Sequence, residues 1–121
     1  QNEGWIGGVF GNRKGDVFLI FRNQKLIRVN DGKLETVQLS GIPNKEWFDM
    51  YSDFESQDGE FWLTSPKGLF RYPKVSDFKD LAKIAPKKVY TTADGLFTNN
   101  VSRIFEDSRG DVWIVSSNNT E

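Results

Sequence analysis

Hydrophobic and polar positions alternate along most of this chain in short runs of the length of β-strands. Three segments share one pattern: a phenylalanine, four mostly polar residues, a glycine, an acid, an apolar residue, an aromatic residue and an aliphatic residue. The three copies are Phe10–Leu19, Phe54–Leu63 and Phe105–Ile114. Their glycines lie 44 and 51 residues apart, which indicates an internal structural repeat.

Each copy predicts a β-hairpin. A tight hairpin turn needs a residue with positive φ, which glycine adopts without steric cost, so we expect this conformation at Gly15, Gly59 and Gly110. The second strand should begin at the apolar residue that follows the acid. Residues 112–115 are apolar at every position, which predicts a strand covered on both faces.

Two further strand-like segments follow each of the first two hairpins. Residues 25–29 and 68–72 alternate apolar residues with arginine, which is typical of a strand with one wetter face. The predicted strands are Ile6–Phe10, Val17–Phe21, Leu26–Val29 and Glu35–Leu39, then Asp49–Glu55, Phe61–Thr64, Leu69–Tyr72 and Lys88–Thr92, then Val101–Asp107 and Val112–Ser116. The pattern therefore predicts four strands in each complete unit and two strands in the third.

The fold class that follows is all-β. Units of this length and strand content predict a partial β-propeller of about two and a half four-stranded antiparallel blades. The blades are expected at residues 6–40, 49–92 and 101–121, the last incomplete, within one domain fragment that spans residues 1–121. Because so few blades cannot close a ring, we expect a fragment of a larger propeller, or self-association through open blade edges.

One stretch interrupts the repeat. Residues 76–85 predict a short surface helix, with Ser76 as the N-cap and Pro86 as the stop. Its periodic apolar residues are Phe78, Leu81 and Ile84. We expect a helical insert at residues 73–87 of the second blade, which accounts for the longer spacing there; a docking role is the alternative.

The amino-acid composition limits the classes of function that the chain could have. The 121 residues carry a net charge of −1 and include no histidine and no cysteine, so neither a disulfide framework, a thiolate metal site nor His-based catalysis is expected. We expect no metal and no cofactor, and the balanced charge argues against nucleic acid as a partner. The longest apolar run, residues 17–21, is too short to cross a bilayer, and we expect any export signal or membrane anchor outside this sequence.

The repeated acids Asp16, Glu60 and Asp111 could suggest paired catalytic carboxylates. One acid at the same hairpin position of every repeat instead favours a structural role, which we expect to be the capping of turn amides. The equally periodic aromatic residues are Phe18, Trp62 and Trp113, which we expect in the blade core.

Residues outside the repeat are the better ligand candidates. Trp47 and Phe48 belong to a loop that is longer than its counterpart at residues 97–100, where Asn99 and Asn100 lie. An exposed aromatic ring in such a loop could stack on a sugar, because loops on rigid scaffolds often carry function. The alternative, a plug between blades, is favoured by the sequence.

Residues 101–114, preceded by Asp94-Gly95-Leu96, resemble the two-component regulator propeller repeat, and residues 68–72 resemble its second half. The resemblance covers nearly the whole chain outside the insert. The first copy departs from the family, with Phe18 in place of tryptophan and Gly11-Asn12 where Glu-Asp is usual. The resemblance implies the periplasmic sensor region of a bacterial hybrid two-component regulator, often a tandem seven-bladed propeller followed by a β-sandwich, a membrane helix and a histidine kinase. Many such regulators respond to polysaccharide breakdown products.

The function expected from this resemblance is a non-catalytic, periplasmic ligand-recognition module of an inner-membrane-anchored homodimer. Its partners would be the other blades of the propeller and an oligosaccharide ligand. Two alternatives remain open: a fragment of a polysaccharide lyase or glycosidase whose catalytic acids come from other blades, and a protein-interaction scaffold.

Overall fold

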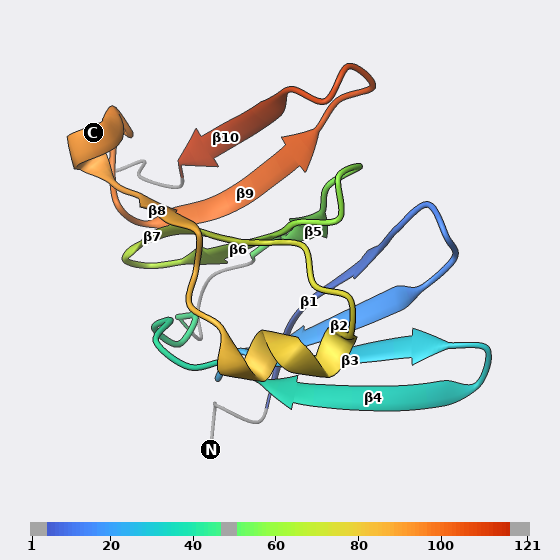
Figure 1. Ribbon diagram of the computed structural model, residues 1–121. Helices are drawn as coiled ribbons and strands as arrows, with labels where there is room; N and C mark the ends of the chain where they lie inside the picture. The colour runs from blue at the N-terminus through green and yellow to red at the C-terminus, as the bar shows by residue number, and fades with distance from the viewer. Residues whose placement is uncertain (1–4, 47–50, 117–121) are drawn as a thin grey trace.

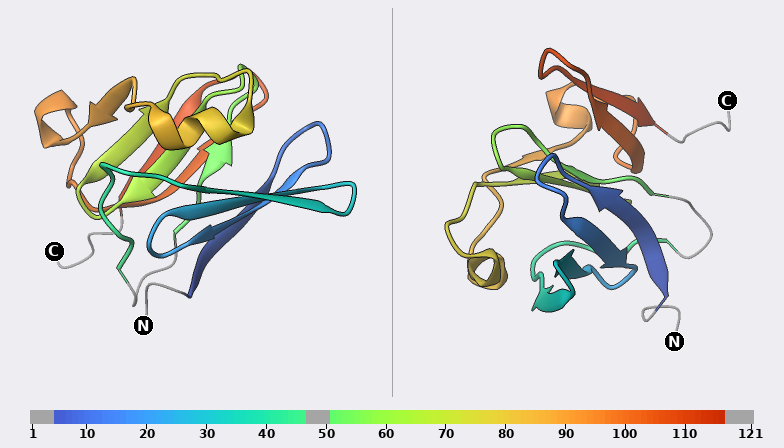
Figure 2. Two further views of the ribbon diagram at one scale, coloured as in Figure 1. Left: turned by 60° about the horizontal axis from the view of Figure 1, so that its bottom comes forward. Right: turned by 90° about the vertical axis from the view of Figure 1, so that its right-hand side faces the viewer.

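The computed structural model describes residues 5–46 and 51–116, which form three antiparallel β-sheets stacked in layers (Figures 1 and 2). The first sheet consists of β1 (Ile6–Gly11), β2 (Val17–Phe21), β3 (Lys25–Asn30) and β4 (Lys33–Gln38). The second sheet consists of β5 (Phe54–Glu55), β6 (Phe61–Ser65), β7 (Gly68–Tyr72) and β8 (Lys88–Tyr90). The third sheet consists of β9 (Val101–Glu106) and β10 (Val112–Ser116). Strands pair in chain order, and the predicted partial propeller is confirmed.

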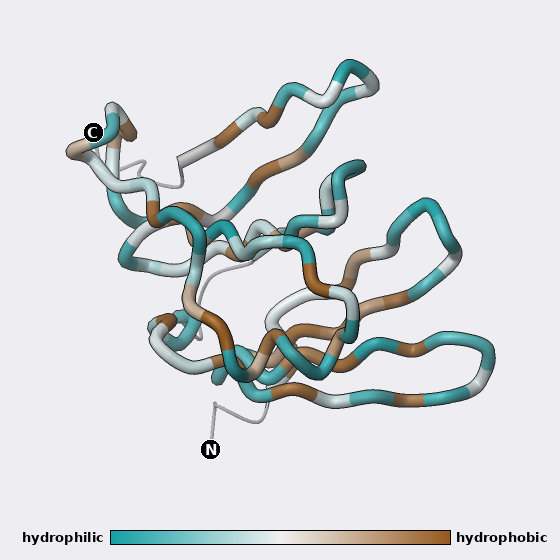
Figure 3. The backbone as a smooth tube through the Cα atoms, viewed as in Figure 1, coloured by the Kyte–Doolittle hydropathy of each residue, from teal (hydrophilic) through white to brown (hydrophobic). Residues whose placement is uncertain are grey.

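The first hairpin of every sheet turns in the same way. Gly15, Gly59 and Gly110 have φ angles of 93°, 88° and 89°, as predicted. In each turn the glycine amide donates to the carbonyl three residues earlier, over 3.3, 2.9 and 3.0 Å respectively. All three turns lie on the same side of the stack, where the chain is hydrophilic (Figures 1 and 3). The sequence repeat is therefore also a repeat of backbone structure.

The first strands of successive sheets are in contact, since β5 contacts both β1 and β9, and β6 also contacts β9. Further out, the short 3-10 helix η2 (Phe78–Lys83) packs against β4 and fills the space between the first and second sheets (Figure 1). Phe78 and Leu81 of this helix are buried in the same cluster as Phe18 and Phe61. The insert is thus part of the packing between two sheets.

The second sheet is covered on both faces. All five residues of β6 are buried. On one face, the ring of Phe61 meets Phe18 edge-on, with centroids 5.3 Å apart. On the other face, Trp62 packs with Val101 and Ile104 of the third sheet.

The expectation of a buried aromatic residue in every repeat is right for two of the three. Phe18 and Trp62 are buried, but Trp113 is 53% exposed. The prediction that residues 112–115 are covered on both faces is also wrong. Among the described residues, no sheet lies against the face of β10 that carries Trp113.

The structure also corrects several boundaries. The insert is a 3-10 helix capped by Asp77, whose carboxylate accepts from the Lys79 amide, and not a helix capped by Ser76. A three-residue spacing places Phe78 and Leu81 on one face of such a helix. The strand predicted at residues 88–92 ends at Tyr90, because Thr91 caps the 3-10 helix η3 (Thr92–Asp94). The strand predicted at residues 49–55 pairs at Phe54–Glu55, and residues 49–50 lie outside the described part.

Candidate functional site

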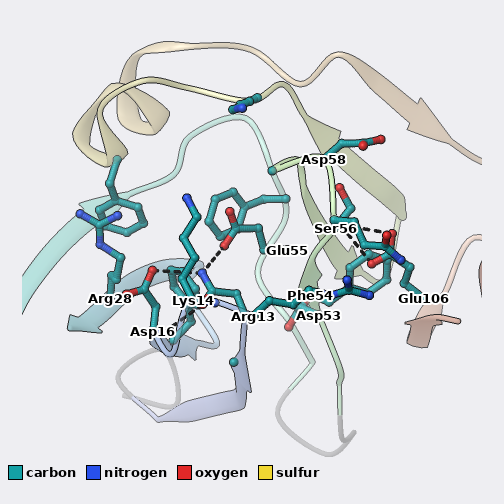
Figure 4. A pocket seen from close by; sticks show the side chains of 18 of the residues that line it. Arg13, Lys14, Asp16, Arg28, Asp53, Phe54, Glu55, Ser56, Asp58 and Glu106 are labelled. Atoms are coloured by element: carbon teal, nitrogen blue, oxygen red, sulfur yellow. Dashed lines mark hydrogen bonds between the residues drawn. The ribbon is translucent and has the colours of Figure 1, made fainter. Parts of the chain in front are cut away.

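A polar groove of about 630 Å³ lies among the β1–β2 turn, the β5–β6 turn and residues 74–78 (Figure 4). Its lining includes the cationic residues Arg13, Lys14, Arg28 and Lys74 and the acidic residues Asp16, Glu55, Asp58 and Glu106. Both signs of charge are present side by side, so the groove is suited to hydrogen-bonding a polar ligand without a strong net charge.

Asp16 is fixed at the wall of this groove. Its carboxylate accepts hydrogen bonds from the side-chain amides of Asn12 and Asn30. Burial raises the pKa of Asp16, but the hydrogen bonds from Asn30 and Asn12 and the charge of Arg28 outweigh it, so the net pKa is below the ordinary value. Asp16 is therefore ionised at neutral pH, and each of its two carboxylate oxygens accepts a hydrogen bond.

Glu60 occupies the same hairpin position in the second sheet. Its two carboxylate oxygens accept from Arg71 Nε at 2.7 Å and from Lys87 Nζ at 2.6 Å. Burial raises the pKa of Glu60, but the hydrogen bonds and charges of Lys87 and Arg71 outweigh this effect, so the net pKa lies below the ordinary value. The guanidinium of Arg71 also lies 4.8 Å from the ring centroid of Trp62, so the acid orients a cation that packs on the aromatic residue.

The prediction that the repeated acids cap turn amides is wrong in its detail. The caps are the residues three positions before each glycine: Asn12, Ser56 and Asp107. Each side-chain oxygen accepts from the backbone amide of the residue that follows the glycine. A short side-chain acceptor can reach into the turn from this first position. Asp16 and Glu60 accept hydrogen bonds from other side chains of their own sheets and connections instead.

The seams between sheets repeat a second contact. Glu55 accepts from the Asn12 side chain at 2.7 Å, across the first seam. Glu106, at the equivalent position of the third sheet, accepts from the Gln57 amide at 3.1 and 3.2 Å, across the second seam. The residues after the second and third repeat phenylalanines thus join their sheets to the turn of the preceding sheet.

The structure describes two of the four predicted ligand residues, Asn99 and Asn100. Trp47 and Phe48 lie outside the described residues. The side-chain oxygen of Asn99 accepts from the Thr92 amide at 2.8 Å, which ties it to η3. The Asn100 side-chain oxygen lies 3.5 Å from the Tyr51 hydroxyl, so the two connecting loops meet at the opposite end of the sheets from the hairpin turns (Figure 1).

Sequence reasoning missed a buried ion pair beside these loops. Lys45 Nζ lies 3.1 Å from Asp53 Oδ1 and 2.7 Å from the Thr64 carbonyl oxygen, and both charged side chains are fully buried. The signal was present, because Asp53 precedes a repeat phenylalanine where the other copies have Val9 and Ile104. An acid at a core position requires a partner of opposite charge.

Comparison with known proteins decides the family of the third repeat. The sequence model of the family described as two component regulator propeller matches residues 95–118. The segment 95–118 is a two component regulator propeller repeat. The match covers the segment that leads into β9, β9 itself and β10, the copy of the pattern whose resemblance is closest. No curated protein matches the chain significantly.

Around this propeller repeat, the described residues offer hydrogen-bond donors, acceptors and charges of both signs. No cluster of three acidic, histidine or cysteine side chains that could hold a metal ion occurs in residues 5–46 and 51–116. Among the same residues, no helix has the length and hydropathy that a membrane crossing requires. The regulator propeller family is non-catalytic in itself. Asp16 and Glu60 are held ionised, whereas glycoside hydrolysis needs one carboxyl group kept protonated near neutral pH.

Proposed function

We propose that this chain is part of the ligand-recognition region of a two-component regulator and that it binds oligosaccharides without transforming them. The match of the regulator propeller family at residues 95–118 carries the proposal. The polar groove, with cations and carboxylates intermixed, supports it, because hydroxyl groups of a sugar both donate and accept hydrogen bonds. In this proposal the propeller lies in the periplasm, and a histidine kinase elsewhere in the regulator receives the signal.

Two places on the chain are candidates for the ligand. The first is the set of residues predicted from the sequence, Trp47, Phe48, Asn99 and Asn100, among which an aromatic ring could stack on a sugar. The second is the groove, where Lys14 is exposed in the β1–β2 turn. Binding at either place would transmit a signal only if it stabilised one arrangement of a regulator dimer more than another.

Calorimetric titration with oligosaccharides derived from xylan, arabinan and pectin tests the proposal. We expect saturable heat with at least one of the three, and no change in the chain length of the sugar after prolonged incubation. Trp47→Ala tests the first place, Lys14→Ala tests the groove, and Trp113→Ala is the matched control, because Trp113 is 53% exposed and belongs to neither candidate place. Absence of binding to the whole panel, or cleavage of a bound sugar, would contradict the proposal.

A further inference from the structure

The acidic groups that line the groove are, with one exception, already engaged within the chain. Side-chain amides donate to the carboxylates of Asp16 and Glu55. Asp53 is fully buried against a lysine ammonium group, and both oxygens of Glu106 accept from one backbone amide. Asp58 is exposed and accepts no hydrogen bond among the described residues. Four of these five acids therefore have little capacity left to bind a ligand.

The cationic groups of the groove are mostly unengaged. Arg28 donates to a glutamate of β4, and its guanidinium lies 4.8 Å from the ring centroid of Phe78. Arg13, Lys14 and Lys74 are exposed, and their side chains form no hydrogen bond or ion pair within residues 5–46 and 51–116. The formal charges of the lining nearly balance, but the charge that remains free to bind a ligand is positive.

Two turns present these cations to the same space. Arg13 and Lys14 belong to the β1–β2 turn, and Asp58 belongs to the β5–β6 turn (Figure 4). The carbon chain of Lys74 lies over the β5–β6 turn, since a Cβ added at Gly59 would meet its Cγ and Cδ at 3.2 Å. A ligand that lies between the two turns would therefore meet exposed cations from both.

We propose that the groove selects an acidic oligosaccharide, whose uronate carboxylate is bound by Arg13, Lys14 and Lys74. This inference rests on the proposed function and goes beyond it by naming the chemical group that the groove selects. A neutral sugar offers hydroxyl groups alone, whereas a carboxylate accepts charge-assisted hydrogen bonds, which are about twice as strong. One carboxylate is sufficient, so the rest of the ligand can be a neutral sugar chain that forms hydrogen bonds with the other polar groups of the lining.

Calorimetric titration with two matched pairs of sugars tests the inference. The first pair is a xylo-oligosaccharide that carries one glucuronate and the same xylo-oligosaccharide without it. The second pair is trigalacturonate and its full methyl ester. We expect the acidic member of at least one pair to bind about tenfold more tightly than its neutral partner. Sodium chloride should weaken binding of the acidic member more than that of the neutral member, because salt screens exposed charges.

Substitutions in the groove test which side chains bind the carboxylate. Lys14→Gln and Lys74→Gln should each weaken binding of the acidic member about fivefold, the upper range for an exposed ion pair. Glutamine at position 74 keeps part of the carbon chain that lies over Gly59. Asp58→Asn should strengthen binding of the acidic member, since it removes the unengaged acid. Lys67→Gln is the matched control, because Lys67 is exposed in the β6–β7 turn and does not line the groove; it should bind both members like the wild type.

The outcomes separate this inference from the proposed function. Equal affinity within both pairs, or tighter binding of the neutral members, overturns the inference and leaves oligosaccharide recognition standing. The inference is also overturned if the acidic member binds more tightly but Lys14→Gln and Lys74→Gln bind it like the wild type, since the carboxylate would then be bound elsewhere. Absence of binding to all four sugars and to the wider panel contradicts the proposed function itself, and the inference fails with it.

Discussion

The buried pair of Lys45 and Asp53 offers the sharpest test of how the first two sheets are held together. Lys45 follows the first sheet, and its backbone amide donates to the Arg22 carbonyl at 2.7 Å. Its ammonium group reaches Asp53 and Thr64 of the second sheet, where neither Lys45 nor Asp53 is exposed. Burial lowers the pKa of Lys45, and Asp53 acts in the opposite direction, so each charge depends on the other.

Lys45→Met removes the cation and keeps much of the side-chain volume. Asp53 Oδ1 would retain the bonds from Thr64 N at 2.7 Å and Thr64 Oγ1 at 2.9 Å, but Oδ2 already has no hydrogen-bond partner among the described residues. Leaving a buried charge without its counter-ion costs about 3–5 kcal/mol of the free energy of unfolding. This is a large fraction of the roughly 5–15 kcal/mol that holds a domain together.

A double-mutant cycle followed by urea unfolding measures this interaction. We expect Lys45→Met and Asp53→Asn each to lower the unfolding midpoint, and the double variant to lose about 1–3 kcal/mol less than the sum of the two. Lys67→Met is the matched control, because Lys67 lies exposed in the β6–β7 turn, and it should stay within about 0.5 kcal/mol of the wild type. Additive losses, or a Lys45→Met variant as stable as the control, would refute the reasoning.

Three further predictions follow from the repeat. Gly59→Ala and Gly110→Ala should each lower the free energy of unfolding by about 1–2 kcal/mol, since both positions have positive φ, and urea midpoints equal to the wild type would contradict this. Phe18→Ala should lower the free energy of unfolding by about 3–5 kcal/mol and Phe105→Ala by much less, because Phe18 is 1% exposed and Phe105 is 51% exposed. Equal losses in urea unfolding would show that burial does not decide the difference. The pKa of Glu60 is lower in the folded chain than in the unfolded chain. Its contribution to the free energy of unfolding is therefore complete above the unfolded pKa near 4.5 and is lost as the pH falls through the folded pKa. Between pH 6 and 3, Glu60→Gln should lose less stability than the wild type, as measured by thermal unfolding.

The local pattern of the sequence was sufficient for the strands and the turns. Each hairpin depends on contacts within about ten residues, and the positive φ at Gly15, Gly59 and Gly110 follows from the steric freedom of glycine alone. Strand order was also predictable, because consecutive strands joined by short turns pair as neighbours. The fold class therefore needed no knowledge of distant contacts.

Partners across the sheets could not be derived in the same way. The acid of each repeat was expected to cap its own turn, yet Glu60 pairs with Lys87, 27 residues away, and Asn12 reaches Glu55, 43 residues away. Which polar groups meet depends on how the layers stack, and a repeat pattern alone does not specify that. The Lys45–Asp53 pair was missed for the same reason, although the acid at position 53 departed visibly from the pattern.

Burial was decided by tertiary structure alone. Trp62 and Trp113 have the same place in the repeat, stack on equivalent phenylalanines and begin from the same kind of turn, yet one is buried and the other is half exposed. The amino-acid sequence determines that a sheet has an apolar face, since that depends on the alternation of side chains along a strand. Whether the face is covered depends on a second sheet lying against it, and only the three-dimensional arrangement of the layers provides that.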